Sequence, residues 1–185
     1  MSASGSAEAP SAAPGAPGAL VLGDDDEVTP QRLREALGRF TTGVTIITCL
    51  DGQGQRTGLT ANSFNALSLD PPLVLWSLRR QSEQLAAFAA AGHFSVNVLS
   101  QRQLALSRRF ASRRDDKFDE GDWSAGVGGV PVLSGCAAVF ECQIELQQEA
   151  GDHVLFVGRV LVLTQAPLPP LVYQAGHYHA LGDKL

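Results

Sequence analysis

The stretch Cys136–Leu163, CAAVFECQIELQQEAGDHVLFVGRVLVL, decides the fold class of this chain. It contains two runs, Cys136–Leu146 and His153–Leu163, that are rich in apolar and β-branched residues and alternate in part between apolar and polar positions. Between them stands the turn sequence Glu149-Ala150-Gly151-Asp152. Two such runs around a short turn predict a long antiparallel β-hairpin.

Further strands are predicted on the N-terminal side of this hairpin. Val44–Leu50 and Arg56–Asn62 flank the turn residues 51–54 and predict a second hairpin, and Leu73–Leu78 and His93–Leu99 are shorter runs of the same kind. The regular strand–helix alternation and the Gly-x-Gly-x-x-Gly turn of a doubly wound fold are missing. We therefore expect a mainly β (α+β) fold, a small barrel of Greek-key-like antiparallel strands with peripheral helices.

Two of the helices are predicted from their starts. Thr29-Pro30 provides an N-cap and a first-turn proline before apolar residues at helical spacing, so a helix is expected over 30–39, where it would cover one end of the core. Ser82 is expected to cap a second helix that ends at Gly92. Each would lie outside the barrel.

A third helix is predicted from a capping box. Ser100 stands three places before Gln103, the spacing at which the two side chains satisfy each other's backbone N–H groups. The helix is expected to end near Phe110. The charged, glycine-rich segment 111–129 is predicted to be a long loop.

Composition divides the chain at residue 27. Of the 185 residues, 19 are acidic and 14 basic, but residues 1–27 hold five acidic groups and no basic one, so residues 28–185 balance at 14 and 14. Residues 1–19 are almost entirely Ala, Gly, Ser and Pro, a composition that buries too little apolar surface to fold. We expect 1–27 to be a disordered tail and 28–185 to be the working domain.

Several classes of protein are excluded by charge and hydropathy. No apolar run approaches the roughly 18 residues of a membrane-spanning helix, and the net charge of -5 disfavours a nucleic-acid binder. The N-terminus lacks the basic start and apolar stretch of a secretory signal, so a cytoplasmic location is expected.

The odd count of three cysteines, Cys49, Cys136 and Cys142, fits neither a disulfide framework nor a zinc site and indicates buried thiols, with a catalytic thiol as the alternative.

Basic residues gather in one part of the domain. Eight of the 14 lie between positions 79 and 117 and would create a positive field suited to a small phosphorylated anion, although a solvated helix face would have the same composition. Arg80 stands out because it lies between a strand end and the helix cap Ser82. There a guanidinium, a hydroxyl and backbone N–H groups are expected to converge on a phosphate.

Two other features are candidates for a site. Gly58–Pro72 is rich in small and hydrogen-bonding residues, so it is either a Ser/Asn-rich turn or a segment whose backbone meets a flat polar heterocycle closely. His153, at the start of a strand, is either a surface histidine or a catalytic one. His177 and His179 have the spacing of a pair of metal ligands, but no acidic or cysteine partner is placed convincingly nearby, so we predict no metal site. No nucleophile elbow, phosphate loop or paired carboxylates point to a hydrolase.

Taken together, these segments resemble the flavin reductase family of short-chain flavin:NAD(P)H oxidoreductases, the reductase components of two-component monooxygenases. The resemblance covers about residues 31–182. Each motif alone is weak evidence for the family, but the presence of all of them in this order is strong evidence. The motifs are Leu37–Thr48, Gly58–Pro72, Phe94–Leu99, Asp116–Phe118, Gly151–His153 and Gly176–Leu181.

The resemblance implies an FMN-binding split β-barrel, a homodimer, and a set of site residues. Flavin mononucleotide is the expected cofactor, FAD is possible, and NADH or NADPH is the reductant. Glu83-Gln84 departs from relatives that carry small or hydroxylated residues after the serine. By this resemblance the catalytic residue is His153, and the cofactor-binding residues are Thr60, Ala61, Asn62, Ser63, Ser77, Arg79, Arg80, Ser82, Lys117 and Tyr178.

The implied activity is hydride transfer from NAD(P)H to the flavin, with reduced flavin diffusing to a flavin-dependent monooxygenase. Two alternatives remain from other classes of protein. One is a split-barrel flavin carrier or sensor without reductase activity, and the other is a dimeric interaction module with an empty barrel. Mixing the purified protein with FMN and NADH separates the three.

Overall fold

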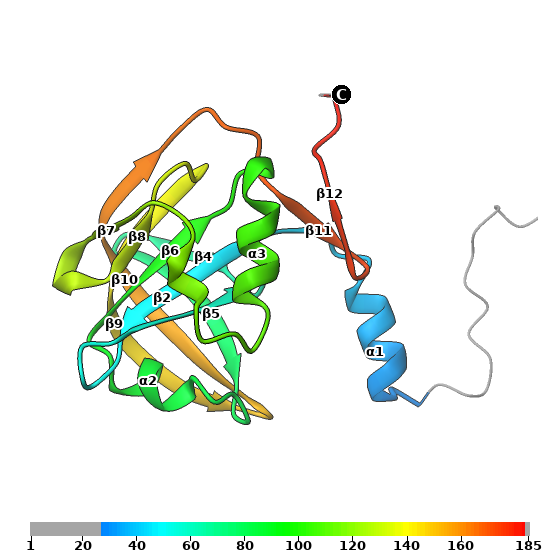
Figure 1. The fold of residues 1–185 in the computed structure, drawn as a ribbon. Coiled ribbons are helices and arrows are strands. Elements are labelled where there is room, and N and C mark those ends of the chain that lie inside the picture. Colours follow the sequence, from blue (N-terminus) through cyan, green and yellow to red (C-terminus); the bar gives the residue numbers. More distant parts are fainter. Residues whose placement is uncertain (1–26, 184–185) are drawn as a thin grey trace, which may run out of the picture.

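One curved, seven-stranded antiparallel sheet dominates the computed structural model, which describes residues 27–183 (Figure 1). Its strand order is β3-β2-β6-β9-β10-β5-β4, so among the described residues β3 and β4 are the two ends of the sheet. The expected mainly antiparallel β fold with peripheral helices is confirmed. The segment predicted to be a disordered tail lies outside the described residues except for Glu27. The bounds are β2 Thr45–Leu50, β3 Arg56–Ala61, β4 Asn65–Leu69, β5 Pro72–Arg79, β6 His93–Val98, β9 Ala138–Ala150 and β10 His153–Gln165.

Smaller elements surround the large sheet. A three-stranded sheet joins β1 to β11 and β12, and a two-stranded sheet joins β7 to β8. No helix in the range 27–183 is long and apolar enough to cross a membrane. The bounds are β1 Thr42–Gly43, β7 Trp123–Ala125, β8 Pro131–Leu133, β11 Val172–Gln174, β12 His177–His179, α1 Pro30–Leu37, α2 Leu85–Ala90 and α3 Leu104–Phe110, with 3-10 turns at Gln101–Gln103, Lys117–Asp119 and Val127–Gly129.

The predicted long hairpin is the pair β9–β10. Its register runs from His153 opposite Ala150 to Gln165 opposite Ala138, with irregularities that bend both strands. At one of these bends Gly158 lies directly against the ring of Phe94, and a Cβ at this position would overlap the ring. Glycine is therefore required here for the hairpin to curve over the core.

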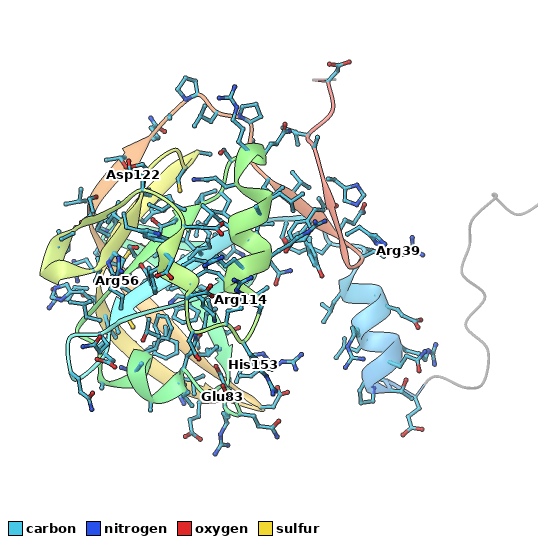
Figure 2. All side chains as sticks on the ribbon, viewed as in Figure 1. Arg39, Arg56, Glu83, Arg114, Asp122 and His153 are labelled. Atoms are coloured by element: carbon cyan, nitrogen blue, oxygen red, sulfur yellow. The ribbon has the colours of Figure 1, made fainter. Side chains whose placement is uncertain are left out.

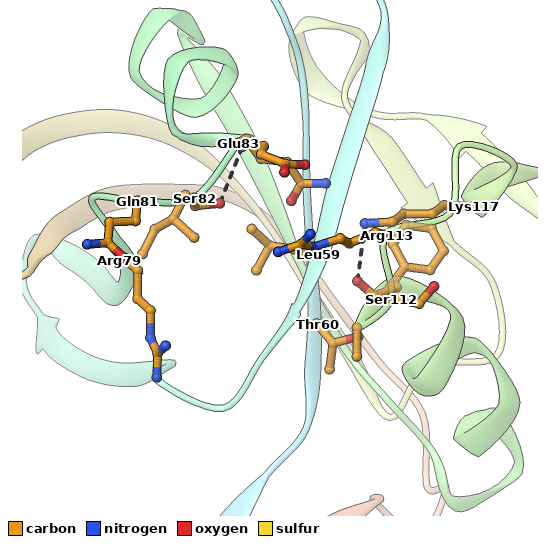
Figure 3. Close-up of a pocket in the computed structure, with 13 residues that line it drawn as sticks. Leu59, Thr60, Arg79, Gln81, Ser82, Glu83, Ser112, Arg113 and Lys117 are labelled. Atoms are coloured by element: carbon orange, nitrogen blue, oxygen red, sulfur yellow. Dashed lines mark hydrogen bonds between the residues drawn. The ribbon is translucent and has the colours of Figure 1, made fainter.

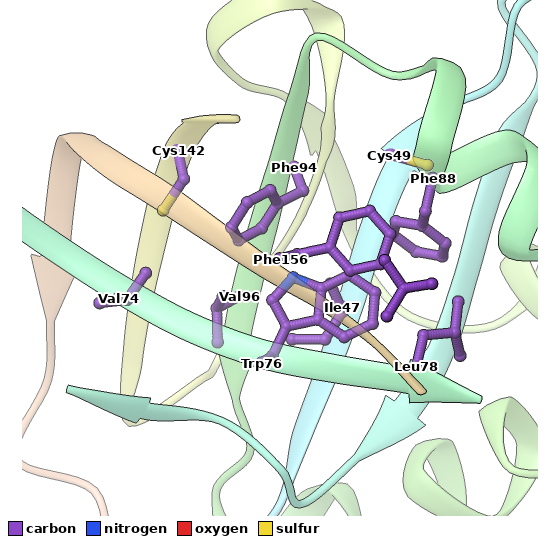
Figure 4. Close-up of a cluster of buried hydrophobic side chains, with 11 residues drawn as sticks. Ile47, Cys49, Val74, Trp76, Leu78, Phe88, Phe94, Val96, Cys142 and Phe156 are labelled. Atoms are coloured by element: carbon purple, nitrogen blue, oxygen red, sulfur yellow. The ribbon is translucent and has the colours of Figure 1, made fainter. Parts of the chain in front are cut away.

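Both faces of the central strands are buried. In β2, Ile47 packs into a cluster of apolar residues on one face, whereas the adjacent Ile46 packs into a second cluster on the other, because successive side chains point to opposite sides. Four aromatic side chains lie at the centre of the first cluster, namely Trp76, Phe88, Phe94 and Phe156 (Figure 4). In it Trp76 stacks on Phe156 at a centroid distance of 4.7 Å and meets Phe88 edge-on at 4.9 Å.

A buried polar network fixes the β7–β8 region to the large sheet. The Thr48 and Ser95 hydroxyls both donate to the carbonyl oxygen of Pro131, at 2.5 and 2.7 Å. The Asn97 amide donates to the carbonyl of Ile46 at 3.0 Å and accepts from the Leu133 N–H at 2.8 Å. Because these groups are buried, each needs a partner, and their pairing sets the position of β8.

Two helix predictions needed correction. The helix expected over 30–39 forms as α1 with Thr29 as its cap, but it does not cover the core: none of its residues is buried, and Figure 1 shows it standing away from the large sheet beside β11 and β12. Ser82 does not cap α2. The chain makes an extra turn after Ser82, whose hydroxyl accepts from the Gln84 N–H, so that the helix begins only at Leu85.

The other helix prediction is confirmed. Gln103 folds back so that its side-chain carbonyl accepts from the Ser100 N–H at 3.0 Å, as the capping box requires, and α3 ends at Phe110. The strands β1, β4, β7, β8, β11 and β12 were not predicted, because each is short. Of these, β7 lies inside the segment 111–129 that was expected to be a loop.

We predict that Asn97→Ala lowers the free energy of unfolding by about 2–4 kcal/mol, because it leaves the Leu133 N–H and the Ile46 carbonyl buried without partners. The exposed Asn65 provides the matched control, and Asn65→Ala should change stability by no more than about 0.5 kcal/mol. Urea unfolding followed by circular dichroism measures both. Equal stabilities for the two variants would contradict the role given to the network.

Candidate functional site

A cavity of about 420 Å³ lies where the curved sheet comes round on itself without pairing. One wall comes from β3, with Leu59 and Thr60, and the opposite wall from the end of β5, with Leu78 and Arg79. This size suits a small-molecule ligand. Figure 3 shows Arg79, Gln81 and Ser82 on one side of the cavity and Ser112 and Lys117 on the other; its remaining lining residues are Glu83, Gln84, Phe110, Ala111 and Arg113.

Close packing of β3 against α3 shapes the inner end of this cavity. Gly58 lies against the Phe110 ring, and a Cβ at Gly58 would meet that ring at 2.9 Å. The Gly58 carbonyl accepts from the Gln84 amide at 2.9 Å and from Lys117 at 3.5 Å. A residue larger than glycine would therefore push α3 and its following loop away from the sheet.

A second cavity of about 190 Å³ continues from the first along β3. Thr60 and Ala111 line both cavities, and the second is lined in addition by Val44, Ala61, Asn62, Tyr173 and Tyr178. The Asn62 side chain makes no hydrogen bond to another described residue and is free to bind a ligand. The small side chains of Ala61 and Ala111 leave the backbone accessible to a flat molecule.

Hydrogen bonds through Ser107 fix this second cavity. Its hydroxyl pairs with the Tyr178 hydroxyl at 2.9 Å, and its carbonyl accepts from the Thr60 hydroxyl at 2.6 Å. Strand β3, helix α3 and strand β12 are thereby tied together around one buried serine. Tyr173 packs edge-on against Tyr178, so the aromatic wall is rigid. Tyr173 was missed from the sequence because its strand was not predicted.

Ser63 and Ser77 have a structural role in the absence of a ligand. The Ser63 hydroxyl donates to the Ser77 carbonyl at 2.9 Å and accepts from the Ser77 N–H at 3.1 Å. This pair joins the chain just after β3 to β5 across the gap in the sheet. Neither serine lines the two cavities, in contrast to Thr60, Ala61, Asn62, Arg79, Ser82, Lys117 and Tyr178.

Arg80 and His153 lie beside the first cavity rather than in its wall. The Arg80 guanidinium is exposed and forms an ion pair with Glu149 at 3.4 Å. His153 stands opposite Arg79 in the β5–β10 register, and its Nδ1 pairs with the Asp152 carboxylate at 2.7 Å. That hydrogen bond lowers the pKa of Asp152. The imidazole is therefore held at the rim by a carboxylate, partly exposed to solvent (Figure 2).

A buried arginine holds the loop that forms the outer wall. The Arg109 guanidinium, only 8% exposed, donates to the Asp116 carbonyl and to the Glu120 carboxylate at 2.7 Å. A hydrogen bond from Arg114, together with the charge of Arg109, lowers the pKa of Asp116 to about 2. The sequence showed this group only as part of the basic cluster, because its partners lie in a loop with no pattern.

The charge lining the first cavity is positive overall. Arg79, Arg113 and Lys117 face a single carboxylate, that of Glu83. Burial lowers the pKa of Lys117, whereas Glu83 and Asp115 raise it. A cation whose charge is disfavoured by burial gains stability when an anion binds, so this cavity is suited to a phosphate or similar group.

The three cysteines are buried and outside these cavities. Burial, mainly, raises the pKa of Cys49 and Cys142 to about 12 and that of Cys136 to about 11. The thiolate is therefore almost absent at neutral pH, and the alternative of a catalytic thiol is not supported.

Comparison with known proteins gives one consistent result. Residues 37–182 match the family model described as flavin reductase like domain. The chain is 46% identical over 145 residues to an FMN reductase (NADH), SmoA, of Agrobacterium fabrum, covering 78% of this chain and 82% of that protein. It is 44% identical over 149 residues to a probable flavin reductase of Rhizobium meliloti, covering 80% of this chain but only 48% of that protein.

Solved structures agree in fold. The Streptomyces globisporus NADH:FAD oxidoreductase SgcE6, in complex with NAD and FAD fragments, superimposes with a TM-score of 0.78 and 35% identity, over 82% of this chain and 92% of that one. The chain spans only about half the length of the Rhizobium meliloti relative, so that relative carries a further segment.

We predict that Arg109→Ala exposes the loop after α3 and speeds tryptic cleavage at Arg113 or Arg114 by about tenfold or more, since proteolysis follows the population of the open loop. Arg102 is exposed and lines neither cavity, so Arg102→Ala is the matched control and should leave the cleavage rate unchanged. Mass spectrometry of the fragments identifies the cut. Unchanged cleavage in Arg109→Ala would mean that the loop is held elsewhere.

Proposed function

The chain belongs to the flavin reductase like domain family, and from that membership we propose that it catalyses hydride transfer from a reduced nicotinamide dinucleotide to a flavin and supplies the reduced flavin to a partner monooxygenase. The observation that carries the proposal is the pair of joined cavities along β3, the larger of which reaches the end of β5. The smaller is lined by the small residues Ala61 and Ala111 and by two tyrosines, and the larger is lined by three cations. Together they match a flavin ring in the second cavity and its phosphate in the first. We call them the ring cavity and the phosphate cavity.

The lining residues of the two cavities are suited to such a ligand. The ring would lie against the backbone of Thr60, Ala61 and Asn62, with Tyr178 on the other wall. The ribityl phosphate would be held by Ser82, Arg79 and Lys117, to which we add Arg113. Lys117 is partly buried, and burial lowers its pKa, so an anion bound beside it would stabilise its charge.

The hydride chemistry is supplied by the bound flavin and the nicotinamide, and the protein contributes orientation and electrostatics. The Ser107–Tyr178 and Ser107–Thr60 hydrogen bonds keep the walls of the ring cavity fixed, and aligned contact can lower a barrier by roughly 7–11 kcal/mol. Cations in the neighbouring cavity stabilise negative charge. His153, at the rim and oriented by Asp152, would position the reductant.

The proposal includes a homodimer. Apolar side chains on α1 and just after it are exposed, with Leu37 at 63% and Phe40 at 71%, and Leu69 of β4 is 95% exposed. Large apolar side chains exposed on a monomer are candidates for an interface. Light scattering should give twice the 19.5 kDa mass of the chain; the monomer mass would rule the dimer out.

The function itself is tested by mixing the purified protein with flavin and NADH or NADPH. Oxidation of the reduced nicotinamide that depends on both flavin and protein is expected. Flavin binding without turnover would instead support the carrier or sensor, and neither binding nor turnover would support the interaction module. Addition of a flavin-dependent monooxygenase then tests the transfer of reduced flavin.

We predict that His153→Ala lowers kcat/KM for NADH by about tenfold to a hundredfold, the usual cost of a misplaced reactant, while the Kd for flavin changes less than about twofold. His179 is an exposed histidine of β12 that lines neither cavity, and His179→Ala is the control. Steady-state kinetics and flavin titration measure the two quantities. Equal kcat/KM for the variant and the parent protein would reject the role of His153.

We predict that Ser82→Ala combined with Arg79→Ala weakens FMN binding by about tenfold or more, because charge-assisted bonds to the phosphate are lost, and leaves riboflavin binding within about twofold. Arg80→Ala is the matched control, since Arg80 pairs with Glu149 and does not line the cavity. Fluorescence titration with each flavin measures the change. A similar loss for FMN and riboflavin would move the phosphate site elsewhere.

A further inference from the structure

A third cavity of about 370 Å³ adjoins the phosphate cavity on the side away from the ring cavity. It is bounded by the β2–β3 turn, by α2 and by the loop after α3, and it has no role in the function proposed above. Figure 2 labels three of its lining side chains, Arg56, Glu83 and Arg114. The other lining residues are Asp51, Thr57, Gly58, Gln84, Ala87, Arg113, Asp115, Lys117 and Phe118.

The three cavities form one continuous groove. Thr60 and Ala111 line both the ring cavity and the phosphate cavity. Glu83, Gln84, Arg113 and Lys117 line both the phosphate cavity and the third cavity. A mononucleotide flavin would end in the phosphate cavity and leave the third part empty, whereas a dinucleotide would continue into it.

The charges at the junction suit a phosphate that lies between the two cavities. Arg113 and Lys117 line both cavities and supply two cations there, against the one carboxylate of Glu83. The third cavity continues beyond these cations, so a second phosphate and a nucleoside could follow the first along the groove.

The far wall of the third cavity is suited to a nucleoside. The Arg56 guanidinium lies over the Phe118 ring, 4.9 Å from its centroid, and so presents a flat cationic face that is already ordered. Nucleobases stack readily on arginine planes and aromatic rings. Asp115, in the same wall, offers carboxylate oxygens that accept hydrogen bonds from ribose hydroxyls.

We propose that the third cavity binds the adenosine monophosphate half of FAD, so that FAD is the preferred flavin of this protein. The proposal rests on the function proposed above and names its substrate. The diphosphate lies between Arg113 and Lys117, and the adenine stacks on the Arg56–Phe118 pair. The nicotinamide dinucleotide then has to use the open side of the ring cavity.

The test compares the affinities of the full chain for FAD and FMN, measured by fluorescence titration with the oxidised flavins. The parent protein should bind FAD at least about fivefold more tightly than FMN, as expected for one added base stack. Arg56→Glu should remove most of that difference and change the Kd for FMN by less than about twofold. Arg102→Glu makes the same charge change outside the three cavities and should change neither affinity.

A second pair of variants tests the volume of the cavity rather than its charge. Ala87 and Ala86 are neighbours on α2, and only Ala87 lines the third cavity. Ala87→Gln should weaken FAD binding selectively, whereas Ala86→Gln should not. Circular dichroism melting of every variant checks that the fold is retained. If either Arg56→Glu or Ala87→Gln does not fold, the other of these two variants carries the test.

Three results overturn the proposal. Equal affinity of the parent protein for FAD and FMN would do so, as would an unchanged FAD affinity in both Arg56→Glu and Ala87→Gln. A rise in KM for NADH with no change in FAD affinity would assign the cavity to the adenylate of the reductant instead. Failure to bind either flavin would overturn the proposed function itself, and this outcome is distinct from flavin binding without preference.

Discussion

The absence of a hydrogen-bonded ladder between β3 and β5 is the constraint on which the rest of this structure depends. The sheet curls around an aromatic core until these two strands face each other, yet their backbone groups do not pair. The Ser63 hydroxyl, bonded to both backbone groups of Ser77, joins the two sides, and the Gln84 side chain adds a bond to the Gly58 carbonyl. The gap that remains holds the principal cavity, so the imperfect closure of the sheet and the site are one feature.

The outer wall of the groove is positioned by side-chain contacts rather than by secondary structure. Arg109 fixes the loop that carries Arg113 and Lys117, and Phe118 of the same loop packs edge-on against Phe110 and Trp123. The buried hydrogen bonds of Arg109 are costly to leave unmade, so they add to this aromatic packing in holding the loop. In this way a domain that is neutral overall keeps cations in one place.

Much of the framework was predictable because its signals are local. The β9–β10 hairpin, the β2–β3 hairpin and the capping box at Ser100 all follow from patterns within a few residues, and all are confirmed. The position of α1 was not predictable, since an amphipathic pattern indicates that a face will be covered but not by which surface. Ser82 failed as a cap because a turn of four residues and a helix start look alike in sequence.

The candidate site was predicted in part, from the resemblance rather than from local patterns. The residues that line the two joined cavities and that the resemblance names as cofactor-binding are Thr60, Ala61, Asn62, Arg79, Ser82, Lys117 and Tyr178, and their contacts with a cofactor stay a prediction. Arg113 and Tyr173 were missed, because a loop without pattern and a strand of three residues bring them there. The loop of Arg109 depends on contacts between side chains and backbone that no spacing rule describes.

The two tryptophans give this fold a pair of separate optical reporters. Trp76 is fully buried in a dry aromatic cluster, and its indole N–H has no partner among the described residues, so its emission reports on the core. Trp123 donates its indole N–H to the Glu120 carbonyl and contacts Phe110 and Phe118, which line the first and third cavities. Emission from Trp123 therefore reports on the groove, so the two emissions distinguish unfolding of the core from ligand binding at the site.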